Sequence, residues 1–201
     1  MPILETNRLI LREWQLMDAD ALAEGLNNLE VSKWLAYVPH PYTKGDAESF
    51  IAYCMSELEG YYYFAIVLKA ESKVIGGVSL DRINEAQGIA GGGGIWINEA
   101  YHGRGYGTEA FGARIAFAFE TLGLRRLENG FFEGNTASQK MQERLGYVIE
   151  GKRRKGYFCK ADGQYKDEII TGLLREEWMP LMSEYVFVKR ENTHEAIVNG
   201  Q

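Results

Sequence analysis

The sequence predicts an α/β fold in which helices flank a central mixed sheet whose strands are mostly antiparallel. Two observations carry this prediction. Tyr61–Leu68 and Val74–Leu80 are apolar runs rich in β-branched residues, and the short turn Glu71–Lys73 between them predicts an antiparallel hairpin. Further on, the strand-like run Ile95–Ile97 and the run Arg126–Phe132 are separated by a segment with helical apolar spacing. A crossover of that length predicts that these two strands lie parallel.

Before the hairpin, the chain is expected to form one strand and three helices. Alternation of apolar residues around Leu9 and Leu11 predicts the strand. Asp18 is expected to cap the first helix, because its side chain suits the N-cap position. Pro39 and Pro41 exclude helix from the loop before the third one. The expected elements are a strand at Leu4–Trp14 and helices at Ala19–Leu26, Glu30–Ala36 and Asp46–Gly60.

After Gly123, which is a good helix stop, strands are expected to alternate with one more helix. The expected elements are a strand at Arg126–Phe132, a helix at Asn135–Leu145, a strand opening at Tyr147–Glu150, a basic hairpin region at Gly151–Gln164, a last strand at Tyr165–Leu174 and a closing segment at Arg175–Leu181. No repeat or linker divides the chain, so residues 1–182 are predicted to form one domain. Residues 183–201 are expected to be a tail in which Tyr185–Val188 adds a strand or packs on a partner.

Composition and charge argue against several classes of protein. The 201 residues include 22 Lys and Arg against 28 Asp and Glu, a net charge of -6, which argues against a nucleic-acid binder. No apolar stretch reaches membrane-spanning length, and no signal-peptide pattern begins the chain. Cys54 and Cys159 are therefore expected to be reduced thiols of a cytoplasmic protein, and no metal site is expected.

The loop His102–Gly107 (HGRGYG) is the strongest functional signal among the residues. Its three glycines let the backbone approach a ligand closely. From Phe111 onward the apolar residues recur at helical spacing, so a largely buried helix follows the loop. The first N–H groups of a helix have no partner within it and lie at the positive end of its dipole. Such a site suits a phosphate group.

Four segments of the chain resemble the GNAT acetyltransferase superfamily, and within it the branch of ribosomal-protein N-terminal acetyltransferases. They are LETNRLILRE, INEAYHGRGYGTEA, EGNTASQKMQERLGY and YKDEIITGLLREEW, and the match runs over Leu4–Trp178. The resemblance implies a single GNAT-like domain with a splayed sheet, and acetyl-CoA as cosubstrate. The residues expected to hold acetyl-CoA are Ile95, Trp96, Ile97, His102, Gly103, Arg104, Gly105, Tyr106, Gly107, Thr108, Asn135, Ser138 and Lys140.

The sequence departs from the family pattern at three places, and two of them leave the catalytic base open. His102 stands where the family loop usually begins with Gln or Arg. Glycines occupy Gly91–Gly94, where this branch often has a Glu, and no Glu lies near Lys155–Tyr157. The usual positions of a catalytic carboxylate are therefore empty.

Four residues are candidates for proton transfer. Ser138 and Tyr157 compete as the acid that protonates the leaving thiolate, and that acid need not be strong because a thiol has a pKa near ~8.5. Glu128 and Glu133 are candidate bases that act through a water molecule. Each has a plainer interpretation: an exposed helix residue for Ser138, a pocket wall for Tyr157, a strand-edge ion pair for Glu128 and a turn carboxylate for Glu133.

The acceptor is expected to be the α-amine of a protein or peptide. An α-amine with a pKa of ~7.7–8.0 is partly free at neutral pH, whereas a lysine amine near ~10.4 is almost fully protonated. An enzyme without a clear carboxylate base is better suited to an α-amine. The basic stretch Lys152–Lys155 argues against a polyamine, which is a cation. A small-molecule amine (polyamine, amino acid or antibiotic) is the alternative acceptor, and a homodimer is left open.

The residues also admit two rival interpretations. Gly105–Ala110 fits the pattern G-x-G-x-x-A of nicotinamide enzymes, with Glu128 about 20 residues further on as a ribose ligand. In nicotinamide enzymes, however, that pattern directly follows a strand, whereas here Asn98–Gly103 lie between the strand-like run Ile95–Ile97 and the pattern. The second rival is a protein that binds acetyl-CoA without catalysis, which the glycines in place of a carboxylate would support.

Overall fold

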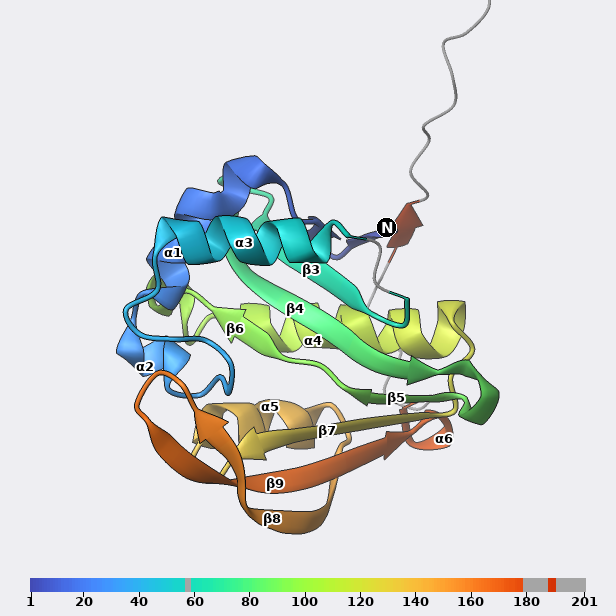
Figure 1. Cartoon of the computed structure of the whole chain (residues 1–201). Coiled ribbons are helices and arrows are strands. Elements are labelled where there is room, and N and C mark those ends of the chain that lie inside the picture. The colour runs from blue at the N-terminus through green and yellow to red at the C-terminus, as the bar shows by residue number, and fades with distance from the viewer. Residues whose placement is uncertain (57–58, 179–187, 191–201) are drawn as a thin grey trace, which may run out of the picture.

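A ten-stranded sheet runs through the centre of the molecule, which is a computed structural model that describes residues 1–56, 59–178 and 188–190 (Figure 1). Its strand order, with each strand's bounds, is β10 (Val188–Arg190), β1 (Ile3–Glu5), β2 (Leu9–Glu13), β3 (Tyr62–Leu68), β4 (Lys73–Asn84), β5 (Ile89–Gly92), β7 (Arg126–Phe132), β9 (Gln164–Leu174) and β8 (Val148–Cys159). The remaining strand, β6 (Ile95–Ile97), pairs with β4 outside this order. Among the described strands, only β5 and β7 pair in parallel, so the expected mixed, mostly antiparallel sheet is confirmed.

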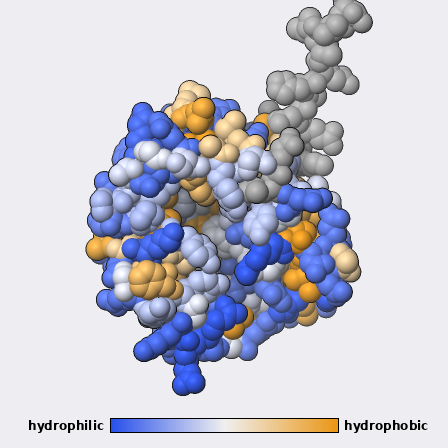
Figure 2. All heavy atoms as spheres, in the orientation of Figure 1, coloured by the Kyte–Doolittle hydropathy of each residue, from blue (hydrophilic) through white to orange (hydrophobic). Residues whose placement is uncertain are grey.

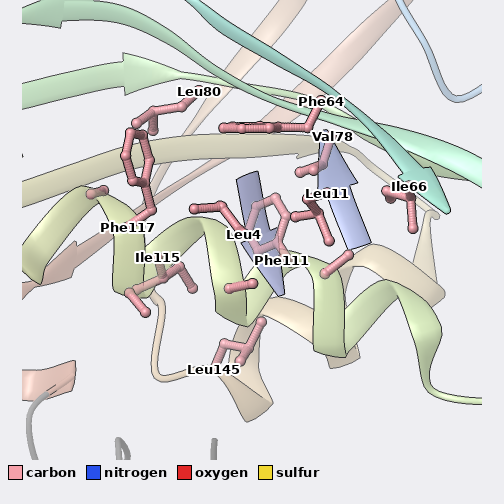
Figure 3. Packing of buried hydrophobic residues seen from close by; sticks show 14 of the residues in the cluster. Leu4, Leu11, Phe64, Ile66, Val78, Leu80, Phe111, Ile115, Phe117 and Leu145 are labelled. Atoms are coloured by element: carbon pink, nitrogen blue, oxygen red, sulfur yellow. The ribbon is translucent and has the colours of Figure 1, made fainter. Parts of the chain in front are cut away.

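Helices cover both faces of the sheet. On one face lie α1 (Ala19–Leu26), α2 (Leu29–Ser32) and α3 (Lys44–Cys54), and on the other lie α4 (Tyr106–Ala116) and α5 (Thr136–Arg144); α6 (Arg175–Trp178) follows β9 (Figure 1). Phe111, Ile115 and Phe117 of the α4 segment pack against Phe64 and Leu80 of the sheet (Figure 3). This helix is buried as its sequence predicted. In the described part of the chain, no helix has the length and apolar character needed to cross a bilayer.

The first segment of the chain differs from its prediction. The single strand expected over Leu4–Trp14 is wrong, because the chain turns at Thr6, whose amide donates to Leu9 O (3.0 Å), and forms β1 and β2 instead. Asp18 does not cap α1 with its side chain. Its carboxylate accepts from the amide of Gln15 (2.9 Å) and pairs with Arg12 (2.7 Å), so it fixes the turn before the helix.

Helix α3 is shorter than expected. It begins after Thr43, whose hydroxyl accepts from the amide of Asp46 (3.2 Å) while the Asp46 carboxylate accepts from the Thr43 amide (2.8 Å). This reciprocal cap is the one that the sequence pattern favours. The helix ends at Cys54 rather than at Gly60, which instead lies in a left-handed conformation (φ +77°) just before β3.

The strand pairing around β6 corrects the predicted crossover. The parallel partner of β7 is β5, through Ile89↔Arg126 and Ala90↔Leu127, and not Ile95–Ile97. Gly93, with φ +139°, separates β5 from β6, and both strands pair with different parts of the long strand β4. Beyond Gly93, β6 therefore stays with β4 while β7 continues with β9, and the sheet splays open between them.

The glycines at this point are explained by what packs on them. A Cβ on Gly92 would lie 2.5 Å from the Arg82 guanidinium, and one on Gly93 would lie 2.7 Å from that of Arg114. Arg114 is fully buried, and its Nη2 donates to Gly92 O (2.8 Å). Glycines thus occupy this run, where the branch often has a Glu, because the guanidinium groups of Arg82 and Arg114 lie against its backbone.

The second half of the chain follows its prediction more closely. Helix α4 continues into a π-helical turn, Phe117–Thr121, and Gly123 adopts the left-handed conformation (φ +68°) of a helix stop. The predicted basic hairpin region is part of one long hairpin, β8–β9, whose turn lies between Cys159 and Gln164. Tyr185–Phe187 of the predicted tail strand and Met179–Leu181 lie outside the described residues, whereas β10 pairs with β1.

Candidate active site

Two open cavities meet where β6 leaves the rest of the sheet. We call them the loop cavity, about 710 Å³, which the His102–Thr108 loop and α5 line, and the aromatic cavity, about 700 Å³, on the face of the sheet that carries α1 and α3. The space-filling view of this face is hollowed near its centre (Figure 2). The junction of the cavities is lined by Trp34, Leu35, Gly93, Gly94, Ile95, Trp96, Asn129, Gly130 and Phe131.

The floor of the loop cavity is the N-terminus of α4. Gly105 is left-handed (φ +79°) and precedes the helix, and the amide of Glu109 donates back to Gly105 O (3.1 Å). The amides of Tyr106, Gly107 and Thr108 come before that first bond, so they are the orphan donors of a helix N-terminus. An anionic group is the natural partner for such amides.

Arg8 holds this loop from outside. Its guanidinium pairs with Glu109 (2.6 Å), donates to Arg104 O (2.9 Å) and lies over the ring of Tyr106 (4.5 Å). The side chain of Arg104 lies over Tyr101 (5.6 Å), and Arg104 does not line the loop cavity. The loop is therefore fixed by one arginine, while the other one, expected at the phosphates, lies elsewhere.

His102 fastens the loop to β6. Its Nε2 is 2.7 Å from the carbonyl oxygen of Ile97, so that nitrogen carries the proton and donates. The residue still lines the loop cavity, with its other ring nitrogen left for a ligand. The phosphate contact expected of His102 is therefore left to Nδ1, and it requires a proton on that nitrogen as well.

Strand β6 offers backbone donors to the cavities. The carbonyl oxygen of Gly94 accepts from the amide of Ser79 (2.9 Å), and the amide of Asn98 also bonds to β4. In a strand, successive backbone groups point to opposite edges. The N–H groups of Ile95 and Ile97 therefore point away from β4, and in the described part of the chain no other strand pairs with that edge.

A buried polar chain supports the expected acid Ser138. Asn135 Oδ1 caps α5 by accepting from the amide of Ser138 (3.1 Å). Ser138 Oγ accepts from Nε2 of Gln142 (3.1 Å), and Gln142 Oε1 accepts from the hydroxyl of Thr171 (2.6 Å). Because Ser138 Oγ is the acceptor, its own proton is free to donate. Asn135, Ser138 and Lys140 all line the loop cavity.

The aromatic cavity combines ring walls with carboxylates. The rings that line it are those of Trp14, Trp34, Tyr37, Tyr42, Phe50, Tyr53, Tyr61, Tyr63, Trp96, Phe131, Phe132 and Tyr157. Asp81, Glu128 and Glu168 also line it. Oδ1 of Asp81 is buried without a hydrogen-bond partner, and burial raises the pKa of this carboxyl despite a hydrogen bond from Ser79 and the nearby Arg114 and Arg82. Such perturbed carboxyls are typical of functional sites.

The four candidates for proton transfer are divided by the fold. Ser138 lies in the loop cavity, whereas Tyr157 and Glu128 line the aromatic cavity, where Glu128 pairs with Arg126 (3.2 Å). Glu133 lines neither cavity and pairs with Lys152 (2.9 Å). The structure therefore favours the plainer interpretation of Glu133, a turn carboxylate, over the role of a base.

The basic stretch Lys152–Lys155 is neutralised in part. Lys152 pairs with Glu133 and also with Asp167 (2.8 Å), and Arg153 pairs with Glu168 (2.5 Å). The argument drawn from this stretch against a polyamine is thus weakened, because two of its four cations have carboxylate partners.

Sequence reasoning missed Asp81 and Glu168 as site residues. Each is a carboxylate inside a strand with one apolar neighbour, Leu80 for Asp81 in SLDRI and Ile169 for Glu168 in DEIITGLL. A charged residue in such a run signals either an edge or a site, and only the strand order shows that both face the same cavity.

Comparison with known proteins agrees with this geometry. The family model described as "Acetyltransferase (GNAT) domain" matches residues 8–148. The chain is 30% identical over 179 residues to uncharacterized N-acetyltransferase p20 of Bacillus licheniformis, covering 89% of this chain and 99% of that one. It is 26% identical over 184 residues to the ribosomal protein uS5 alanine N-acetyltransferase of Escherichia coli K12, covering 88% and 93%. A GCN5-related N-acetyltransferase from Brucella melitensis has a similar fold, with a TM-score of 0.78 and 27% identity over 90% of this chain and 82% of that one.

Proposed function

The chain belongs to the GNAT acetyltransferase family, and we propose that it transfers the acetyl group of acetyl-CoA to the α-amine at the N-terminus of a peptide or protein. The observation that carries the proposal is the junction of the two cavities. One cavity ends in helix amides that suit a diphosphate, the other is walled by rings and carboxylates, and both open on Gly94–Ile95 and Gly130. Two ligands that enter from opposite sides would meet there.

The loop cavity fits acetyl-CoA. The amides of Tyr106, Gly107 and Thr108 would hold the pyrophosphate, and an added Cβ on Gly103 would meet no atom within 4 Å, so the loop surface is open to a ligand. The cavity runs from these amides along β6 to the junction, which gives room for an extended arm beside the strand. When bound there, acetyl-CoA would supply the activated acetyl group.

Residues that line the loop cavity would supply polarisation and a proton. The N–H of Ile95 or Ile97, aimed from the open edge of β6, would polarise the thioester carbonyl as an oxyanion donor does. Ser138, with its Oγ already accepting from Gln142, would give its proton to the leaving thiolate. Tyr157, which competes for this role, lines the aromatic cavity, where it would contact the acceptor instead.

Two arguments support an α-amine as the acceptor. A relative that is 26% identical over most of both chains is named as an alanine N-acetyltransferase of ribosomal protein uS5. An α-amine also needs less help to lose its proton, since about a tenth to a third of it is free at neutral pH. The aromatic cavity, open at the surface, would receive the first side chains of the acceptor.

The test compares free and N-terminally blocked peptides that carry the same internal lysines, with release of the CoA thiol as the readout. Acetylation of the free peptide alone is expected. Equal acetylation of both would show that a lysine side chain is the acceptor. Turnover of spermidine or a free amino acid, but of no peptide, would favour the small-molecule alternative. Binding of acetyl-CoA without any turnover would leave a silent binding protein.

A further inference from the structure

We propose that Glu168 is the general base of this acetyltransferase, taking the proton of the acceptor amine at the junction of the two cavities. The inference rests on the proposed acetyl transfer and assigns the role that the sequence left open. It is carried by the position of the Glu168 carboxylate, by its ion pair and by the absence of a side chain at Gly130.

The carboxylate lies directly over Gly130. A Cβ built on Gly130 would be 2.6 Å from Oε1 of Glu168 and 3.0 Å from its Cδ. Gly130 lines both cavities, and it lies opposite Gly94 and Ile95 across the junction. Oε1 therefore lies on the β7 side of the space in which an amine from the aromatic cavity would meet a thioester from the loop cavity.

One oxygen of Glu168 is held and the other is left for a ligand. Oε2 accepts from Nη1 of Arg153 on the neighbouring strand β8 (2.5 Å), which fixes the carboxylate in the cleft. No hydrogen bond to Oε1 is found within the described residues. The side chain is only 15% exposed, and burial raises the pKa of this carboxyl against the attraction of Arg153 and Arg82. A raised pKa makes a carboxylate a stronger base near neutral pH.

The other carboxylates of the site are less well placed. Asp81 lies on β4 opposite Gly92, deeper than the junction, where Ser79 bonds its side chain. Glu128 is opposite Gly172 in the register of β7 and β9, four residues along β7 from Phe132, the partner of Glu168. Of the three acidic residues that line the aromatic cavity, Glu168 is the one whose carboxylate oxygen is found 2.6 Å from a Cβ built on a glycine of the junction, Gly130.

The acceptor ammonium gives one proton to Oε1 of Glu168, directly or through one water, and the nitrogen lone pair forms the C–N bond to the thioester carbonyl carbon. The C–S bond then breaks, and the leaving thiolate takes the proton of the Ser138 hydroxyl. The second proton of the nitrogen returns to Ser138 Oγ through water, so the hydroxyl is restored. One proton per turnover leaves through Glu168 to solvent.

The experiment compares wild type with Glu168→Gln, with acetyl-CoA and whichever free-amine peptide or amine of the panel above the wild type acetylates. The expected result is a fall in kcat of about 10²–10⁴-fold at pH 7, the range for loss of a general base, with the Kd for CoA by calorimetry unchanged. The deficit should shrink by about six- to tenfold in total between pH 7 and pH 9, as an α-amine with a pKa of ~7.7–8.0 deprotonates by itself.

The titratable or charged groups that line the aromatic cavity with Glu168 also influence the pH profile. They are Arg153 and Tyr157 from β8, Glu128 from β7, and Arg82 and Asp81 from β4. Glu150→Gln is the matched control, because Glu150 also pairs with an arginine, Arg126 (2.5 Å), and also lies over a glycine, Gly172, yet lines neither cavity. It should keep the wild-type kcat and pH profile.

The outcomes separate the two proposals. A wild type that acetylates no acceptor overturns the proposed function, and the role of Glu168 with it. A wild type that turns over while Glu168→Gln keeps its kcat and pH profile overturns the role of Glu168 alone. A loss that is equal at all pH values, or that Glu150→Gln reproduces, assigns Glu168 a structural role and overturns the inference.

Discussion

Oε1 of Glu168 occupies the space that a side chain at position 130 would fill. The distance from Oε1 to a Cβ built on Gly130 is 2.6 Å, and the carbonyl oxygen of Ile169 would be 2.9 Å from the same atom. Contacts this short force either the carboxylate or the backbone of β9 to move. A glycine at position 130 is thus needed for the Glu168 carboxylate to lie at the junction.

Gly130→Ala should therefore damage catalysis more than folding. We expect kcat to fall at least tenfold, because the methyl group displaces the Glu168 carboxylate, while CoA still binds in the loop cavity. Gly151→Ala is the control on the same arm of the sheet, since a Cβ there would meet no atom within 4 Å. Steady-state kinetics with both variants would contradict the prediction if they behaved alike.

Gly105→Ala should weaken CoA binding. Its left-handed backbone (φ +79°) costs a residue with a Cβ about 1–2 kcal/mol, and relief of that strain moves the amides at the start of α4. We expect the Kd for CoA in calorimetry to rise at least tenfold.

Gly123→Ala is the control for strain in this measurement. Gly123 is also left-handed (φ +68°), with open space around its Cβ position, but it lies at the other end of the helical segment. It should lower the melting temperature similarly and leave the Kd unchanged. A Kd shifted equally in both variants would mean that strain, and not the loop, weakens binding.

Ser138→Ala should lower kcat by about 10²-fold, the low end for loss of a general acid, because a thiol is a good leaving group. Ser138→Thr keeps a hydroxyl that can accept from Gln142 and should retain more activity. Single-turnover kinetics would give the rate of the chemical step. If Ser138→Ala were as fast as wild type and Tyr157→Phe slow, the acid would be Tyr157.

Asp81→Asn should stabilise the fold at neutral pH. Burial raises the pKa of Asp81 above the ordinary 3.8, so the folded state holds this proton to higher pH than the unfolded state does. The contribution of Asp81 to stability is therefore most favourable below that ordinary pKa and falls as the pH rises through the raised value. Asparagine has no charge to desolvate, and it can still accept from Ser79.

The measurement is the melting temperature of wild type and Asp81→Asn from pH 3 to pH 8. The variant should melt higher at pH 7, and the difference should vanish as the pH approaches the ordinary pKa of the aspartate. A variant that melts lower at pH 7 would show that attraction to the buried Arg114 outweighs the desolvation of Asp81, contrary to the prediction.

Local patterns determined much of this protein from the sequence alone. The glycine loop, the buried helix after it, the hairpin of β3 and β4 and the capped helix α5 depend on spacing of 3.6 or 2 residues and on glycine and cap residues, all of which are read within one segment. The quoted segments also carried the GNAT resemblance, which the family match over residues 8–148 confirms. Most residues expected at the cofactor line the loop cavity, with Arg104 outside it.

The tertiary structure determined which strands pair and which side chains share a face of the sheet. That β7 pairs with β5 and not with Ile95–Ile97 follows from the bend at Gly93 and from two arginines packed on Gly92–Gly93, which no periodicity encodes. In the sequence, Glu133 follows a strand and Glu168 lies within one, and neither position marks a site. In the fold, Glu133 pairs with Lys152 outside the cavities, whereas Glu168 lies over Gly130. Strand register sets which side chains share a face, and it is fixed by packing across the whole sheet, so the carboxylate at the junction became visible only in the fold.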